Sequence, residues 1–333
     1  MNTFTCCVFT LLSGAVASQA ATRILWQPPS IERSHSMAYG PGGAGGAPRA
    51  PFRFIKEEPS GTTPKVWVRD ANGRTWIAKW GKEVHAEIFA PRLAWALGYH
   101  ASPAYFIREG RIIGASKLGR ASEFINPGGN FRDARFKLID HNYRYVSGGW
   151  SWNKNPFLGR QELAGLKVLM LLVSNWDAKD ARDSGEENTA IFVRGTGPAA
   201  VYHYAVDDWG AALGGWGRFF TRDKWDADEF AEQNNQFIKG IDDRGAVKWG
   251  YSGKHAADLT HGITVRDVRW ILPYLARLSD RDLMAGLRAS GATVLEQKRL
   301  TRSLRYRINS LRRLAATRPA SAKTARIAAA LGR

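Results

Sequence analysis

An apolar segment that leads directly into a polar loop and two strands places the strongest constraint on the fold. Residues Gln161 to Ser174 are apolar on nearly every helical face, which predicts a buried helix. A polar loop, Asn175 to Glu187, follows. Thr189 to Val193 and Val201 to Val206 then have strand composition and are joined by a Gly-Thr-Gly-Pro turn. This order predicts a mixed α+β domain with a hairpin beside a buried helix.

Acidic and amide side chains stand at both ends of this hairpin. Asp177 and Lys179 lie in the loop after the helix, Asn188 precedes the first strand, and Asp208 follows the second strand within Asp207-Asp208-Trp209-Gly210. In-line phosphoryl transfer needs a carboxylate beside the attacking hydroxyl, and an Asn and an Asp to hold the metal that bridges the phosphates. The alternative is that these residues only cap loops and turns, as Asp and Asn often do.

A smaller group of elements precedes this unit. Three segments have strand composition, with an Asn-Gly turn between the last two: Phe52 to Ile55, Lys65 to Arg69 and Thr75 to Trp80. Glu83 to Leu97 shows helical spacing of apolar residues and ends before Gly98. Two short strands are expected next, Ala104 to Arg108 and Arg111 to Ala115. We therefore expect a small antiparallel sheet crossed by one helix.

Lys79 ends the third predicted strand among apolar neighbours. Glu83 and Glu87 follow four and eight residues later, on one face of the predicted helix. A strand lysine held by a glutamate of the next helix is how kinases grip the α- and β-phosphates of a nucleotide. The alternative is a solvated edge lysine beside a surface helix pair.

The turn between the first two strands reads Ser60-Gly61-Thr62-Thr63-Pro64-Lys65. Phosphate oxygens need close backbone approach and N–H donors, which a glycine and hydroxyl residues at a strand turn can supply. An ordinary turn has a similar composition. The turn therefore indicates phosphate binding only in combination with Lys79.

These segments together resemble the protein-kinase-like superfamily, and within it the atypical branch of HipA-type and lipid-kinase-like enzymes, over residues 52–315. The turn that begins at Ser60 resembles the HipA-type phosphate loop, in which a Ser-Gly pair is followed closely by Pro-Lys. Lys79 matches the nucleotide lysine of the family, and Glu87 matches its helix partner better than Glu83 does. As a whole, the chain is similar to bacterial proteins of this kinase-like type, some of them secreted.

The second half of the motif set continues the resemblance. Asp177 and Lys179 resemble the Asp-x-Lys of the kinase catalytic loop, Asn188 resembles the metal-binding Asn, and Asp208-Trp209-Gly210 resembles the Asp-Phe-Gly metal site. The resemblance implies a two-lobed fold that binds ATP and Mg²⁺. It also implies a set of residues around the nucleotide, namely Ser60, Gly61, Thr62, Thr63, Lys65, Lys79 and Glu87.

Two features depart from the family pattern. Asp177 and Asn188 stand eleven residues apart, whereas typical kinases have about five between the corresponding positions. Residues 180–187 must therefore loop out if the two side chains are to meet, and otherwise a pseudokinase is implied. The doubled Asp207-Asp208 leaves the metal ligand ambiguous, although Asp208 has the Asp-x-Gly spacing.

Both ends of the chain are expected to lie outside the kinase-like part. Residues 1–20 resemble a secretory signal but lack Lys and Arg at their start, so a true start at Met37 is the alternative. The only cysteines, Cys6 and Cys7, lie there, which excludes thiol catalysis and disulfides from the remainder. Export would place the protein where ATP is scarce, so the compartment stays open: periplasmic or secreted with a real signal, and cytoplasmic otherwise.

The domain organisation follows from these segments. We expect a Gly/Pro-rich linker over residues 21–51, a small lobe over 52–117, a larger, mainly helical lobe over 118–315 and a basic tail over 316–333. Val265 to Leu278 and Leu300 to Leu314 are the clearest helices of the large lobe. The seven histidines show no metal-binding spacing, so we expect none of them to hold a metal.

The formal net charge of +18 attracts phosphates on nucleotides, nucleic acids or lipids. After Glu296 the chain has eleven Lys or Arg residues and no acid. A final helix with a solvated basic face is one interpretation, and contact with an anionic membrane or nucleic acid is the other.

The leading interpretation is an ATP- and Mg²⁺-dependent phosphotransferase that acts on a hydroxyl of a protein, lipid or small molecule. The alternatives are an inactive pseudokinase scaffold and a basic protein that binds nucleic acid or an anionic membrane. The sequence does not identify the phosphoacceptor.

Overall fold

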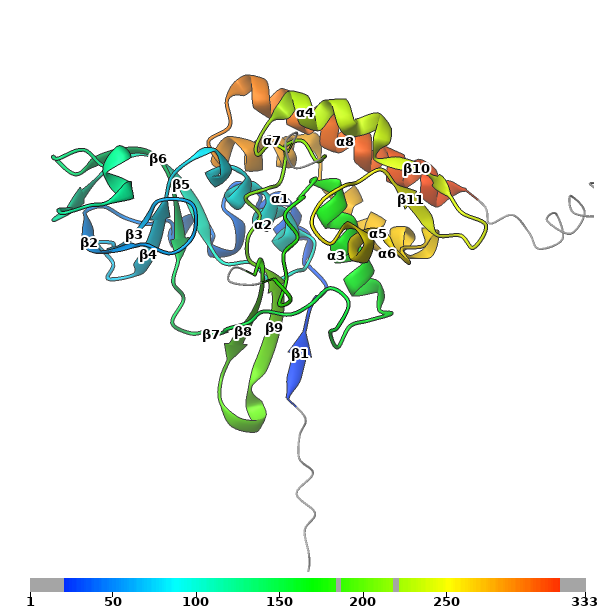
Figure 1. The fold of residues 1–333 in the computed structure, drawn as a ribbon, viewed down its shortest axis with the longest axis horizontal. Helices are drawn as coiled ribbons and strands as arrows, with labels where there is room; N and C mark the ends of the chain where they lie inside the picture. Colours follow the sequence, from blue (N-terminus) through cyan, green and yellow to red (C-terminus); the bar gives the residue numbers. More distant parts are fainter. Residues whose placement is uncertain (1–20, 184–186, 218–221, 318–333) are drawn as a thin grey trace, which may run out of the picture.

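The computed structural model describes residues 21–183, 187–217 and 222–317. They form a mixed α+β fold (Figure 1), as predicted. The predicted signal segment 1–20 and most of the predicted tail lie outside the described residues. No helix among the described residues is both long enough and apolar enough to span a membrane.

Five strands close into a small barrel in the order β2-β3-β4-β6-β5. Their bounds are β2 Phe52–Glu58, β3 Lys65–Arg69, β4 Thr75–Lys79, β5 Ala104–Ile113 and β6 Asn130–Leu138. The three predicted strands and the helix that follows them are confirmed in this order. The small antiparallel sheet that was predicted is a closed barrel instead, because β2 also pairs with β5 in parallel.

The predicted strand pair around Glu109-Gly110 is a single strand, β5, and its partner β6 was not predicted. Gly110 does not turn the chain: it pairs with Phe131 within the β5–β6 ladder. A Cβ atom at Gly110 would lie 2.7 Å from the Phe131 ring, so glycine makes room for an aromatic side chain. The barrel thus extends to residue 138, past the boundary predicted at 117.

Alternation along β3 and β4 decides which side chains face the barrel core. Val66, Val68, Trp76 and Ala78 are fully buried in this core. The intervening residues, including Lys79, project from the opposite face, on which helix α2, Ala86–Ala96, lies. The predicted helix over 83–97 is therefore confirmed, with a short 3₁₀ turn, Lys82–Val84, before it.

The larger core is mainly helical. Helix α3, Gln161–Leu172, is buried within this larger core, as predicted. The helices around it are α4 Ala227–Glu232, α5 Ala256–Thr260, α6 Val265–Ala276, α7 Asp280–Ala289 and α8 Val294–Ala316. Helices α6, α7 and α8 each begin with a capping box, which satisfies their first free N–H groups. A hairpin of β10, Ile238–Ile241, and β11, Val247–Trp249, completes this part.

Helix α8 contains the predicted basic helix. Arg307 is fully buried and donates hydrogen bonds to the Leu172 carbonyl and the Ser174 hydroxyl at the end of α3. Two other arginines on α8 form ion pairs, Arg299 with Asp228 and Arg305 with Asp280. Binding of the remaining basic face to a membrane or nucleic acid stays a prediction.

A second sheet has the order β1-β9-β8-β7, with bounds β1 Thr22–Ile24, β7 Arg144–Val146, β8 Thr189–Arg194 and β9 Val201–Val206. The predicted β8–β9 hairpin is confirmed, and β1 runs parallel to β9 along its side (Figure 1). The hairpin ends at the polar segments that hold Asn188 and Asp208.

Residues 21–51, predicted to be a linker, are packed against the rest of the protein. They include β1, helix α1, Ile31–His35, and Met37, which is fully buried. A Cβ atom at Gly42 would lie only 2.0 Å from the Tyr105 hydroxyl. The glycines of this stretch therefore allow close packing on the barrel rather than a free chain.

Candidate active site

Lys79, the last residue of β4, lies between two glutamates. Its ammonium group lies 2.6 Å from Glu87 Oε1 and also contacts Glu83 Oε1. Burial would lower the pKa of Lys79, but the carboxylates of Glu87 and Asp208 outweigh it and raise this pKa above its usual value. Lys79 is therefore a buried, permanently charged ammonium group.

Glu87 also lies 3.3 Å from Arg135 on β6, measured from Oε2 to Nε. The sequence favoured Glu87 over Glu83 as the partner of Lys79, but the structure uses both. Arg135 was missed because β6 was not recognised as a strand. Arg135 pairs with Lys79 across the β4–β6 ladder, so barrel closure brings its side chain to the same face.

Glu83 connects three separate segments. It accepts a hydrogen bond of 2.7 Å from the Thr63 hydroxyl, and it contacts the ammonium groups of Lys79 and Lys224. Burial would raise the pKa of Glu83, but Lys79 and the hydrogen bond from Lys224 outweigh it and lower the pKa to about 2. Glu83 therefore stays ionised and links the barrel to the larger core.

The predicted phosphate loop is held from outside by one arginine. Arg120 donates hydrogen bonds to the carbonyl oxygens of Pro59 at 2.7 Å, Gly61 at 2.8 Å and Thr62 at 3.3 Å. Ser60 and Thr62 are exposed, whereas Thr63 reaches Glu83. Lys65, at the start of β3, pairs directly opposite Lys79. The loop thus joins the Lys79 region through Thr63 and the β3–β4 ladder.

Asn188 is placed directly beside Asp177 despite their separation in sequence. Its side-chain amide donates to the Asp177 carbonyl oxygen, and its main-chain N–H donates to the Lys179 carbonyl oxygen at 3.2 Å. The ammonium group of Lys179 lies 3.4 Å from Asp177 Oδ2. The chain on the two sides of residues 180–187, called the insertion below, therefore lies close together, as the eleven-residue separation requires if Asp177 and Asn188 are to meet.

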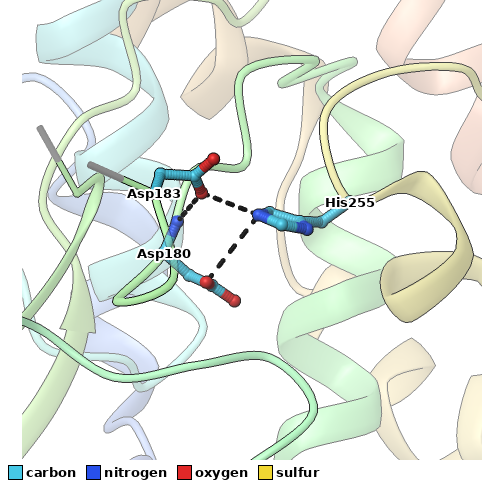
Figure 2. A group of neighbouring side chains, drawn as sticks. All are labelled: Asp180, Asp183 and His255. Carbon is cyan, nitrogen blue, oxygen red and sulfur yellow. Dashed lines mark hydrogen bonds and ion pairs between the residues drawn. The ribbon is translucent and has the colours of Figure 1, made fainter.

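The first residues of the insertion, 180–183, are anchored by a group of charged side chains. Figure 2 shows Asp180, Asp183 and His255, with His255 Nε2 lying 2.7 Å from Asp183 and 3.7 Å from Asp180. Their ligand atoms are close enough for a metal ion. However, Arg182 binds Asp180 at 2.6 Å and Lys254 binds Asp183 at 2.8 Å. These cations already neutralise the carboxylates, so we interpret the group as the anchor of the insertion.

The neighbouring Asp207 and Asp208 have different partners. Asp207 Oδ1 lies 2.5 Å from the ammonium group of Lys137 on β6. Asp208 Oδ1 accepts the Gly210 N–H at 2.7 Å, and the Asp208 carboxylate is one of the groups that raise the pKa of Lys79. Asp207 is thus committed to an ion pair, whereas Asp208 faces the Lys79 region.

Backbone contacts hold Asp208 against the residues around Asp177. The N–H groups of Asp207 and Asp208 donate to the Asn188 carbonyl oxygen at 2.8 Å and 3.3 Å. The Asn175 side chain donates to the Asp208 carbonyl oxygen at 3.3 Å. Sequence reasoning missed Asn175, although it stands only two residues before Asp177. Asp177, Asn188 and Asp208 therefore form one connected group.

The donor atoms of this group suit a hard divalent cation. Because the amide nitrogen of Asn188 binds Asp177, its amide oxygen is left as the ligand atom. Together with the Asp208 carboxylate it offers the oxygen ligands that Mg²⁺ or Mn²⁺ prefers. The residues present therefore fit such an ion.

A cavity of about 640 Å³ reaches the site at Asp207, the neighbour of Asp208 in sequence. Its walls include Trp67 and Ile77 from the outer face of the barrel, and Phe192 and His203 from the β8–β9 hairpin. The Lys137–Asp207 ion pair also lines it, next to Asp208 in sequence. Aromatic and aliphatic walls of this kind suit a flat, largely apolar ring system.

No protein-family model matches the chain, and no curated protein matches it. Among solved structures, the crystal structure of the Golgi casein kinase matches with 12% identity and a TM-score of 0.37, covering 81% of this chain and 75% of that chain. The crystal structure of the Golgi casein kinase with Mn/ADP bound matches with 11% identity and a TM-score of 0.36, covering 87% and 77% of the two chains. TM-scores this low do not establish a shared fold.

Proposed function

We propose that this protein is an ATP- and Mg²⁺-dependent phosphotransferase of the atypical kinase type, acting on a hydroxyl group. One observation carries the proposal: Asn188 bonds the main chain of both Asp177 and Asp208, while Asp208 lies within electrostatic reach of the buried Lys79. These contacts support a site that combines a carboxylate for the acceptor, two metal ligands and a phosphate-binding lysine.

Each residue has a role in the transfer. Lys79, fixed by Glu83 and Glu87, binds the nucleotide phosphates, and the Thr63 segment covers them. Asp208 and Asn188 would hold the divalent ion, which would neutralise phosphate charge. We assign Asp208 rather than Asp207 to this role, because Asp207 is paired with Lys137.

Asp177 orients the acceptor hydroxyl and takes its proton. The acceptor oxygen forms a bond to the terminal phosphorus as the bond to the bridging oxygen breaks, and ADP leaves with that electron pair. Lys179, 3.4 Å from Asp177, balances the charge of the carboxylate before the proton arrives. The base of the nucleotide occupies the 640 Å³ cavity between Ile77 and Phe192.

Nucleotide binding tests the proposal directly. Titration calorimetry with ATP, with and without Mg²⁺, should show binding to the wild type that Lys79→Met loses, since the ammonium is buried at the site. Lys239→Met, at an exposed position on β10, is the matched control and should bind as the wild type does. Transfer of labelled terminal phosphate from ATP to a protein or lipid extract should require Lys79. Absence of ATP binding to the wild type would refute the proposal.

A further inference from the structure

Lys224 is a second lysine at the site, and it comes from the larger core rather than from the barrel. Its ammonium group binds Glu83 Oε2, while that of Lys79 binds Glu83 Oε1. Two ammonium groups that bind the two oxygens of one carboxylate are no more than about 8 Å apart, given ordinary hydrogen-bond lengths. A polyphosphate chain held by Lys79 therefore comes within reach of Lys224.

The backbone around Lys224 is fixed to the residues beside Asp177. The Trp176 indole donates a hydrogen bond of 2.8 Å to the Asp223 carbonyl oxygen, and Trp176 directly precedes Asp177. On the other side of Lys224, the Trp225 indole donates to Glu296 at 2.8 Å, and the Asp226 N–H donates to the Leu213 carbonyl oxygen at 2.9 Å. Lys224 is thus linked through Asp223 to the segment that holds Asp177, and through Glu83 to Lys79.

The Lys224 side chain combines a defined position with access for a ligand. It is 36% exposed, whereas that of Lys79 is 11% exposed. Glu83 holds the ammonium group in place, and a phosphate oxygen with more negative charge can share or replace this contact. Glu83 also accepts the Thr63 hydroxyl, so the same carboxylate aligns the covering loop.

We propose that Lys224 is a catalytic residue that binds the terminal phosphate of the nucleotide and neutralises charge on the phosphoryl group during transfer. This inference rests on the proposed phosphotransferase function. Lys79, at the end of a barrel strand, binds the inner phosphates, and Lys224, beside the Asp177 loop, binds the outer one. The acceptor hydroxyl then approaches a phosphoryl group held from both cores of the protein.

A series of nucleotides separates this role from a purely structural one. Lys224→Met should weaken ATP binding by about tenfold to a hundredfold, the effect of one charge-assisted hydrogen bond, with less loss for ADP and none for AMP. Turnover should fall by at least as much. Lys224→Arg keeps the charge and should bind ATP within a few-fold of the wild type.

Lys82→Met is the matched control for loss of an ion pair between the same two segments. Lys82 is exposed and lies 2.7 Å from Asp223, next to Lys224 in sequence. This variant should keep the ATP affinity of the wild type. Melting temperatures of all the variants show whether each is folded.

Three results would overturn the role of Lys224: unchanged ATP affinity and turnover in Lys224→Met, equal losses for ATP, ADP and AMP, or an equal effect of Lys82→Met. If Lys224→Met does not fold, Lys224→Arg becomes the test. A folded Lys224→Arg variant that fails to bind ATP would also overturn the role of Lys224. Failure of the wild type to bind ATP at all would instead refute the proposed function.

Discussion

The side-chain amide of Asn188 donates a hydrogen bond of 2.5 Å to the main-chain carbonyl oxygen of Asp177, eleven residues earlier in the chain. This contact joins the loop after α3 to the start of β8 across the insertion. It also leaves the amide oxygen of Asn188 as the side-chain atom that can act as a ligand.

Replacement of Asn188 tests this junction. Asn188→Ala removes one ion ligand and the bond to Asp177, so the Mg²⁺ concentration for half-maximal phosphate transfer should rise by about tenfold or more. Asn72→Ala, in the exposed turn between β3 and β4, is the control. An unchanged Mg²⁺ dependence in Asn188→Ala would exclude Asn188 as a ligand.

The two adjacent aspartates should respond differently to substitution. Asp208→Asn removes a charged ligand, so the Mg²⁺-dependent part of ATP binding should disappear, as calorimetry can measure. Asp207→Asn instead breaks the 2.5 Å ion pair with Lys137, and the main effect should be a lower melting temperature. Loss of Mg²⁺ dependence in Asp207→Asn alone would reverse the assignment.

Asp177 should affect turnover but not nucleotide binding. Asp177→Asn keeps the shape of the side chain but cannot accept the acceptor proton, so turnover should fall by about 10²- to 10⁴-fold. ATP affinity should change little, because Asp177 belongs to the acceptor side of the site. Asp243→Asn, at an exposed position, should leave turnover intact. Full turnover in Asp177→Asn would rule out this role.

Glu87 should matter for stability as well as for binding. Glu87→Ala leaves the buried side chains of Lys79 and Arg135 without one shared counter-charge, which should lower the free energy of unfolding by about 3–5 kcal/mol. Glu109→Ala removes an exposed pair with Arg132 at 3.9 Å and should change it by less than about 0.5 kcal/mol. Urea unfolding measures both, and equal effects would contradict the buried network.

His100 should make stability depend on pH. Burial and the neighbouring His203 lower the pKa of His100 from 6.5 to about 4. Between these values the unfolded chain binds a proton that the folded protein does not, so stability is lost as pH falls. The loss at pH 5 should be about 2 kcal/mol relative to pH 8. His100→Phe should flatten the dependence measured by urea unfolding, and an unchanged slope would contradict this origin.

Local sequence patterns determined the elements that depend on neighbouring residues. The continuous apolar character of Gln161 to Ser174 predicted α3, and strand composition with turn residues predicted β3, β4 and the β8–β9 hairpin. These patterns work because a helix face or a strand face must be apolar wherever it is buried. The same order of elements indicated which polar residues stand at strand ends, including Lys79, Asn188 and Asp208.

Only the tertiary structure decided which distant residues meet. Gly110 has the composition of a turn, but it makes room for the Phe131 ring within the β5–β6 ladder, and β6 brings Arg135 and Lys137 to the site. Lys137 and Asp207 are 70 residues apart. Such contacts depend on how the barrel closes on α2 and on the larger core, and no local periodicity encodes that closure. For this reason the sequence identified Lys79 but not the sharing of Glu83 with Lys224.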